Sequence, residues 1–295
     1  MNRVSQIEKI IPYLPTKIRF TFENMSVIDK ENITEIRLRV NRPISVIQNS
    51  IEKYLGSNGG ITTYPNIAIK TTLADIEAVF KSVTEYSIHS YAKELQQGYI
   101  TLDGGNRVGL AGSFQGETLK YINAFNFRVA GEVSGASDEI LSHIKNFPKS
   151  ILLAGKPATG KTTILRDLCK NIGNSYRVSL IDERREIAAC YNGVPQNNIG
   201  LHTDVFEVDK AKGIGLALRV MSPEVIICDE IGLEDDVREI SRSVNSGVKL
   251  IASVHASSRD EVLSNINIKP IITIFDYLVI LRDIGKIEEI IKLRS

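Results

Sequence analysis

The chain has 295 residues, of which 43% are apolar and 24% charged, and its net charge is +1. That length suits one large domain or two ordinary ones with a substantial core. The near-neutral charge argues against a broad electrostatic grip on nucleic acid or on an anionic membrane. Three well-separated cysteines form no metal-ligand pattern and no disulfide framework, which favours a reducing, cytoplasmic setting. No apolar run approaches the ~20 residues that would span a bilayer, so any membrane association is expected to need a partner.

The chain upstream of residue 146 predicts a smaller mixed α+β domain, residues 1–145. Apolar side chains recur at helical spacing in two segments, whereas two other segments alternate in the manner of half-buried strands. A glycine-rich turn between two short β-type runs predicts a hairpin, and residues 50–65 predict a loop or a weak hairpin. In chain order the expected elements are a helix at 4–14, strands at 35–40 and 43–47, helices at 73–83 and 88–95, and a hairpin at 99–110.

Residues 146–295 predict an α/β domain. Short apolar strands alternate here with amphipathic helices, a pattern typical of a parallel sheet covered on both faces. The last two strands flank a turn at 283–285 and are expected to pair antiparallel. The expected strands are 150–154, 177–181, 225–228, 249–253, 277–281 and 287–293, and the clearest helices are 161–170, 210–220 and 235–245.

A glycine-rich motif, G-x-x-x-x-G-K-T, follows the first of these strands and precedes a helix, the context that a phosphate-binding loop requires. Glycines let backbone N–H groups wrap an anion, and the helix N-terminus adds its dipole. Lys161 is expected to reach the β- and γ-phosphates, and the Thr162 hydroxyl to bind Mg²⁺. The sequence therefore predicts ATP and Mg²⁺ as cofactors. The nucleotide-binding residues would be Gly155, Lys156, Pro157, Ala158, Thr159, Gly160, Lys161 and Thr162.

Two other strands end in acidic residues. The strand at 225–228 runs into Asp229 and Glu230, which would stand beside the phosphate loop at the carboxyl edge of the sheet and hold Mg²⁺ or orient the attacking water. The strand at 177–181 runs into Asp182 and Glu183, and Glu183 is a candidate base for water or a metal partner. A solvated charge cluster remains the rival interpretation of the second segment.

Three basic residues are further candidates. His255 follows the strand at 249–253, a position suited to a group that senses the γ-phosphate, although a lone histidine is more often structural. Arg128 and Arg107 could supply charge in trans from a neighbouring subunit, because a transferring phosphoryl group needs nearby cations. Surface arginines are common, so these two are weaker candidates.

The downstream motifs resemble those of type II and type IV secretion ATPases. Residues 218–232 are similar to the second nucleotide motif of that group, Asp182–Arg184 stand where it carries its acidic box, and His255 where it carries its histidine box. The secretion ATPases usually have Gly-Glu where this chain has Asp229–Glu230. Segments at 89–91, 98–101, 107–109, 127–130 and 221–223 more closely resemble the stage III sporulation protein AA family of endospore-forming firmicutes.

The resemblance implies a RecA-like ATPase that works as a homo-oligomeric ring, expected to be a hexamer. Membrane proteins of the sporulation channel would hold it on the mother-cell face, with no direct membrane span of its own. It also implies catalytic roles for Lys161, Glu183 as the acidic-box residue and Glu230 as the acid beside the metal, with Asp229 and Thr162 as metal ligands. An ATP-hydrolysing motor serving sporulation-specific secretion is the leading hypothesis.

Two alternatives belong to other functional classes. A RecA-like motor on single-stranded nucleic acid could use Arg37, Arg39 and Arg42. The absence of tryptophan and the low aromatic content count against it, because such proteins stack bases in basic grooves. A nucleotide-gated scaffold with slow hydrolysis is the other alternative. The sequence leaves it open, since hydrolysis can require a neighbour's arginine.

Overall fold

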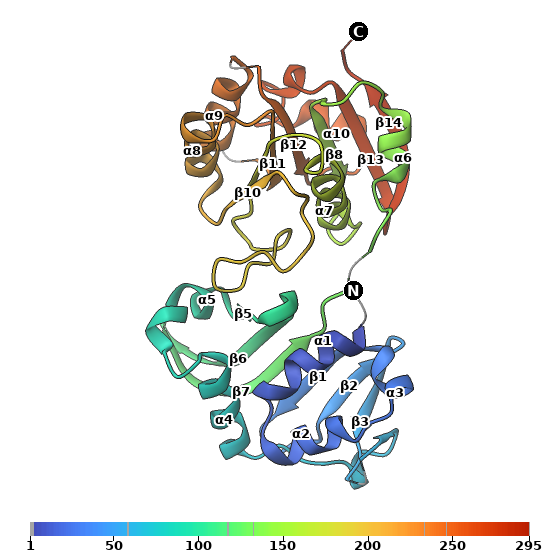
Figure 1. Cartoon of the computed structure of the whole chain (residues 1–295), viewed down its shortest axis with the longest axis vertical. Helices are drawn as coiled ribbons and strands as arrows, with labels where there is room; N and C mark the ends of the chain where they lie inside the picture. The colour runs from blue at the N-terminus through green and yellow to red at the C-terminus, as the bar shows by residue number, and fades with distance from the viewer. Residues whose placement is uncertain are drawn as a thin grey trace. The chain divides into compact units, whose positions relative to one another are not determined.

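The structure is a computed structural model that describes residues 3–57, 59–116, 118–131, 133–232, 234–245 and 247–294. Its contacts divide the chain into two units. Unit 1 comprises Met1–Glu132 and the short segment Cys190–Gln196, and unit 2 comprises Val133–Ala189 and Asn197–Ser295. Each unit has its own seven-stranded sheet and its own helices (Figure 1). No helix within the described ranges is long and apolar enough to cross a membrane.

The strands of the unit 1 sheet pair antiparallel with their neighbours, in the order β4-β3-β2-β1-β7-β6-β5. Its strands are β1 (Ile33–Arg39), β2 (Ser45–Gln48), β3 (Ile51–Leu55), β4 (Ile61–Thr62), β5 (Tyr99–Thr101), β6 (Arg107–Gln115) and β7 (Thr118–Arg128). Its α-helices are α1 (Arg3–Ile10), α2 (Thr16–Glu23), α3 (Val27–Glu31), α4 (Leu73–Val83) and α5 (Ala92–Gln97). Short 3₁₀ turns η1 (Ile11–Tyr13), η2 (Pro65–Ile67), η3 (Ile88–Tyr91) and η4 (Asp103–Gly105) complete the unit.

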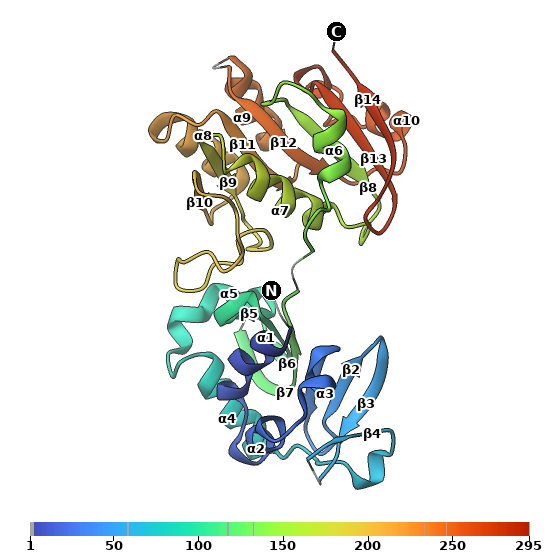
Figure 2. The same cartoon turned by 45° about the vertical axis from the view of Figure 1, so that its right-hand side comes forward.

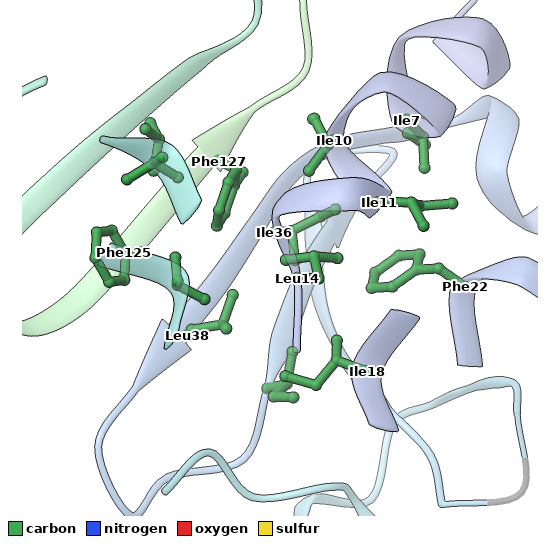
Figure 3. Packing of buried hydrophobic residues seen from close by; sticks show 14 of the residues in the cluster. Ile7, Ile10, Ile11, Leu14, Ile18, Phe22, Ile36, Leu38, Phe125 and Phe127 are labelled. Atoms are coloured by element: carbon green, nitrogen blue, oxygen red, sulfur yellow. The ribbon is translucent and has the colours of Figure 1, made fainter. Parts of the chain in front are cut away.

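The core of unit 1 lies between this sheet and the N-terminal helices. Alternation in β1 turns Ile36 and Leu38 inward, where both are fully buried, and leaves Arg37 and Arg39 on the other face. Figure 3 shows Ile10 and Leu14 packed toward these strand residues and toward Phe127. The apolar stripe predicted at 4–14 therefore does face a core, although the helix becomes a 3₁₀ turn at Ile11 because Pro12 cannot donate the next helical hydrogen bond.

Unit 2 carries a sheet of order β10-β9-β11-β12-β8-β13-β14, parallel except for the last pair. The strands are β8 (Ile151–Gly155), β9 (Val178–Ile181), β10 (Thr203–Phe206), β11 (Val225–Glu230), β12 (Lys249–Val254), β13 (Tyr277–Asp283) and β14 (Lys286–Lys292). The helices are α6 (Asp138–His143), α7 (Lys161–Ile172), α8 (Lys210–Val220), α9 (Glu234–Asn245) and α10 (Arg259–Ser264), with a 3₁₀ turn η5 (Ile272–Ile274).

Both faces of the central strands of unit 2 are buried. On β8, Leu152 and Ala154 join one cluster with residues of α8, α9 and α10, while Ile151 and Leu153 point the other way and are also fully buried. Figure 2 shows α7 crossing the sheet, and α7 contacts β8, β9, β11 and β12. The α/β class predicted for this region, with a parallel core and an antiparallel closing pair, is confirmed.

The unit boundary differs from the predicted change of character at 145/146. Contacts divide the chain between Glu132 and Val133, so residues 133–145 group with unit 2. The physical reason is Asp167 on α7. Its carboxylate accepts hydrogen bonds from the backbone N–H of Gly135 (3.3 Å), from the backbone N–H of Ser137 (2.9 Å) and from the Ser137 hydroxyl (2.7 Å). No pattern in the sequence indicates that α7 would fix this segment.

Candidate nucleotide-binding site

The glycine-rich motif forms a closed loop between β8 and α7. Gly160 has φ +91° and precedes the first residue of the helix, a conformation that L-residues with side chains rarely adopt. A Cβ at Gly155 would lie 2.5 Å from the Thr159 hydroxyl oxygen, so only glycine fits there. The Thr159 hydroxyl in turn donates to the Lys156 carbonyl at 2.8 Å. The loop thus leaves the N-terminus of α7 open as an anion site.

Lys161 is folded back across this loop. Its Nζ donates to the carbonyl oxygens of Gly155 at 2.6 Å and Lys156 at 2.9 Å, and the residue is 7% exposed. Burial lowers the pKa of Lys161 from its ordinary value, whereas the carboxylates of Glu230 and Asp229 act in the opposite direction. An anion at the mouth of the loop would offer the ammonium group a charged partner in place of two neutral carbonyls.

His255 links the loop to the acid at the end of β11. Its Nδ1 lies 3.1 Å from Lys161 Nζ, and its Nε2 lies 2.9 Å from Glu230 Oε2. An ammonium group can only donate, so Nδ1 must accept and the proton must sit on Nε2, which then donates to the carboxylate. The neutral Nε2–H tautomer satisfies both contacts at once. His255 therefore belongs to a continuous polar chain from Lys161 to Glu230.

The acids of β11 have different surroundings. Asp229 is 9% exposed and accepts a long hydrogen bond of 3.4 Å from the Ser253 hydroxyl. Burial raises the pKa of Asp229, with further contributions from Glu186 and Asp182, while Arg184 opposes the shift. Glu230 is more open and lies 3.8 Å from Arg184 Nη1 in addition to its contact with His255. Asp229 is thus a desolvated carboxylate surrounded by other acids, which favours a cation beside it.

The acidic segment after β9 is organised by a residue that the sequence reasoning did not select. Asp182 is fully buried, and its carboxylate accepts hydrogen bonds from the backbone N–H of Glu186 at 2.8 Å, of Ile187 at 3.1 Å and of Ala188 at 2.8 Å. The predicted Glu183 instead pairs with Lys210 on α8 at 2.8 Å. Although burial disfavours the charge on Lys210, Glu183 raises its pKa.

Glu186 is a functional candidate that the sequence reasoning missed. Glu186 contributes, after burial, to the raised pKa of Asp229, so the two carboxyl groups interact electrostatically. The available signal was an acidic residue directly after the strand, because the Asp182 carboxylate accepts hydrogen bonds from three successive N–H groups and so fixes the path of the residues that follow. The bend also places Arg185 at φ +53°, with its guanidinium 3.1 Å from Glu207.

Arg107 and Arg128 belong to unit 1 and lie directly opposite each other on β6 and β7. Arg128 is exposed, and the Arg107 guanidinium lies over the Tyr99 ring, 4.7 Å from its centroid. Like charges at facing positions of neighbouring strands repel, so this pair gains from an anion placed over it. The structure therefore brings the two candidate arginines together, although the sequence treated them separately.

The donor set in unit 2 fits Mg²⁺ when a nucleotide completes the site. Among the described residues no group of three or more acids, histidines or cysteines is arranged to hold an ion by itself. Mg²⁺ ordinarily takes one or two protein oxygens together with phosphate oxygens and water. The Thr162 hydroxyl at the start of α7 and the desolvated Asp229 carboxylate, with Glu230 next to it, supply oxygens of that kind.

The fold of unit 2 shows the structural class to which the chain belongs. Unit 2 and its loop have the architecture of P-loop secretion ATPases, which is the fold class predicted from the sequence. The solved Legionella pneumophila ATPase DotB matches with a TM-score of 0.58 and 12% identity, covering 91% of this chain and 78% of that chain. The pilus retraction motor PilT with bound ADP matches with a TM-score of 0.58 and 16% identity, covering 84% of this chain and 73% of that chain. At such identities the likeness concerns the fold alone.

Within that class, the chain belongs to the family described as Sporulation stage III, protein AA, whose model matches residues 1–294. It is 32% identical over 282 residues to Stage III sporulation protein AA of Bacillus subtilis (strain 168), across 91% of this chain and 86% of that protein. The family membership expected from the motifs is confirmed.

Proposed function

We propose that this chain is a Mg²⁺-dependent ATPase that acts as a motor in sporulation-specific secretion. The observation that carries the proposal is the polar chain from Lys161 through His255 to Glu230, which connects the phosphate loop to an acid at the next strand but one. A loop that only bound an anion would need no such connection. Coupling of Lys161 to Glu230 is what a site requires if it is to respond to the γ-phosphate.

The chemistry follows from these positions. Lys161 exchanges the carbonyls of Gly155 and Lys156 for the β- and γ-phosphates, which releases the loop to close around them. Thr162 and Asp229, with Glu230 beside them, would hold Mg²⁺, which when bound neutralises charge that develops on the phosphate oxygens. Glu230 accepts a hydrogen bond from His255 and retains lone pairs with which to orient a water toward the γ-phosphorus.

Two residues, Glu183 and Glu186, are candidates for the acidic-box function. Glu183 is paired with Lys210, so it would have to exchange that partner before it could act on water. Glu186 contributes to the raised pKa of Asp229 and is the second candidate for the acidic-box function. Comparison of turnover by Glu183→Gln and Glu186→Gln separates the two assignments.

We propose further that the active form is a ring of identical subunits, a hexamer by analogy with the secretion ATPases. Arg107 or Arg128 of a neighbouring copy would then stabilise the charge on the transferring phosphoryl group. Membrane proteins of the sporulation channel would recruit the ring to the mother-cell face. The family membership and the facing arginine pair support this part of the proposal.

The deciding measurement is ATP turnover by the purified protein and by Lys161→Ala. Removal of the ammonium group should reduce turnover by about 10²-fold or more, because it stabilises the phosphates in the transition state. Lys269→Ala is the matched control, since Lys269 is an exposed lysine of the same unit. Equal turnover by Lys161→Ala and the wild-type protein would show that the ATPase assignment is wrong.

A further inference from the structure

The turn between β13 and β14 lies against the phosphate loop. The backbone N–H of Gly285 donates to the Thr159 carbonyl at 3.0 Å. A Cβ at Gly160 would lie 3.2 Å from the Gly285 nitrogen, so the two glycines pack backbone to backbone. The loop motif and this turn are more than 100 residues apart in the sequence, and none of the functions assigned above uses the turn.

The strand order fixes on which side of the loop the turn lies. β13 pairs with β8 in parallel register, with Leu281 opposite Gly155, so both strands end at the same edge of the sheet. β12, which His255 follows, and β11, which ends in Asp229 and Glu230, lie on the other side of β8. The loop is therefore flanked by acids on one side and by the β13–β14 turn on the other.

This arrangement determines the orientation of a bound nucleotide in the site. The γ-phosphate must face His255 and the acids of β11, because those groups are the ones joined to Lys161. The triphosphate then follows the loop around the N-terminus of α7, and the nucleoside emerges on the opposite side. The element that flanks the loop on that side is the turn at 283–285.

The turn carries an apolar side chain where a polar one is usual. Ile284 is 75% exposed at the tip. The turn is held in shape, because the Asp283 carboxylate accepts the Ile284 N–H at 3.0 Å and Gly285 adopts φ +66°. Exposed single isoleucines are common on protein surfaces. An isoleucine fixed on a turn that is hydrogen-bonded to a phosphate loop is different, since its exposed surface borders the space that a nucleoside would enter.

We propose that the β13–β14 turn forms one side of the nucleoside-binding site and that the Ile284 side chain packs on the face of the base. This inference rests on the proposed function, because it assumes that the loop binds a nucleotide. Ile284 offers only dispersion and apolar contact, so it recognises the ring face and not its hydrogen-bonding edge. The hydrogen bond between the Gly285 N–H and the Thr159 carbonyl fixes the position of this turn relative to the phosphate loop.

The test compares the affinities of ATP and of inorganic triphosphate for the full chain with Mg²⁺, measured by isothermal titration calorimetry. Ile284→Ser should weaken ATP binding by about tenfold, as expected for loss of most of one apolar contact. Triphosphate binding should stay within about twofold, because that ligand has no base. Ile266→Ser is the matched control: Ile266 is 82% exposed in the same unit and should leave both affinities unchanged.

Each outcome decides the question. The inference is overturned if Ile284→Ser leaves ATP affinity unchanged, or if it weakens ATP and triphosphate by the same factor, which would indicate a disturbed loop. Thermal unfolding of the variant should match that of the wild-type protein, since the substituted side chain is exposed. A wild-type protein that binds neither ligand would contradict the proposed function itself, whereas loss of the ATP preference alone concerns only the turn.

Discussion

At the residue scale, the two contacts of His255 decide which of its ring nitrogens carries the proton. A histidine at a strand end is unremarkable, and the sequence could not say which ring nitrogen carries the proton. The contacts to Lys161 Nζ and Glu230 Oε2 require an acceptor at Nδ1 and a donor at Nε2, which only the neutral tautomer provides. We expect His255→Gln to retain more turnover than His255→Ala, because an amide can also accept and donate.

The raised pKa of Asp229 predicts how the free energy of unfolding changes with pH. Burial raises its pKa above the ordinary 3.8, so the native state keeps the proton at pH values where the unfolded chain has lost it. Over that interval the native state binds more protons, and the free energy of unfolding falls as pH rises. Without nucleotide or metal, Asp229→Asn should therefore be more stable than the wild-type protein at pH 7. The difference should shrink as the pH approaches 3.8.

Urea unfolding at a series of pH values measures this difference. Asp204→Asn, at an exposed position on the edge strand β10, is the control and should shift stability by less than about 0.5 kcal/mol. The prediction is wrong if Asp229→Asn is less stable than the wild-type protein at pH 7, or if the difference between their free energies of unfolding does not change with pH. Either result would show that the surroundings of Asp229 do not disfavour its charged form.

At the element scale, α4 has the bounds that the sequence predicted, as α8 does, because its start signal is local. Thr72 accepts the Asp75 N–H at 3.2 Å, and the Asp75 carboxylate accepts the Thr72 N–H at 2.7 Å, which forms a capping box. Burial raises the pKa of Asp75, yet hydrogen bonds from Lys17 and Thr72 lower it overall. The cap and its ion pair therefore fix where α4 begins.

Thr72→Ala should reduce the free energy of unfolding by about 1 kcal/mol, the usual cost of a lost N-cap. Thr63→Ala, an exposed threonine of the same unit outside every helix and strand, serves as the control. Chemical denaturation followed by circular dichroism gives both values. Equal stability of the two variants would mean that the capping box contributes nothing measurable.

The elements that sequence reasoning missed depend on distant partners. β7 (Thr118–Arg128) was not predicted, although it is the longest strand of the sheet and pairs with both β1 and β6. Its polar and apolar residues alternate only weakly, so the pairing partners decide its conformation. The short helix α2 was missed for a similar reason, because its apolar residues form a pattern only when Ile18 and Phe22 meet the core (Figure 3). The short helix α3 was missed as well; its apolar residues Val27 and Ile28 are exposed and mark no buried face.

At the scale of the whole molecule, assembly should control activity. If an arginine acts in trans, turnover per subunit should rise with protein concentration as rings form and then level off. Light scattering and ATP turnover over one concentration series provide the measurement. Turnover that stays flat and negligible once rings are present would favour the nucleotide-gated scaffold over the motor.

The candidate site was predictable to the extent that its residues occur in local motifs. The loop from Gly155 to Thr162 and the acids Asp229 and Glu230 follow strands that the apolar runs marked clearly, and parallel strands end at one edge. The roles of Glu183 and Glu186 were not separable in this way. Their placement depends on the buried Asp182 and on Lys210 of α8, which pairs with Glu183.

The sequence by itself determined the class of fold, the family and the position of the phosphate loop, because each is encoded in short-range spacing and strand–helix alternation. Tertiary structure decided which groups meet: His255 with Lys161, the Asp182 carboxylate with three backbone N–H groups, and the turn at Gly285 with Thr159. The first and the last of these contacts join segments that follow different strands, so they depend on strand order. Strand order is set by packing of the whole sheet, which no local pattern specifies.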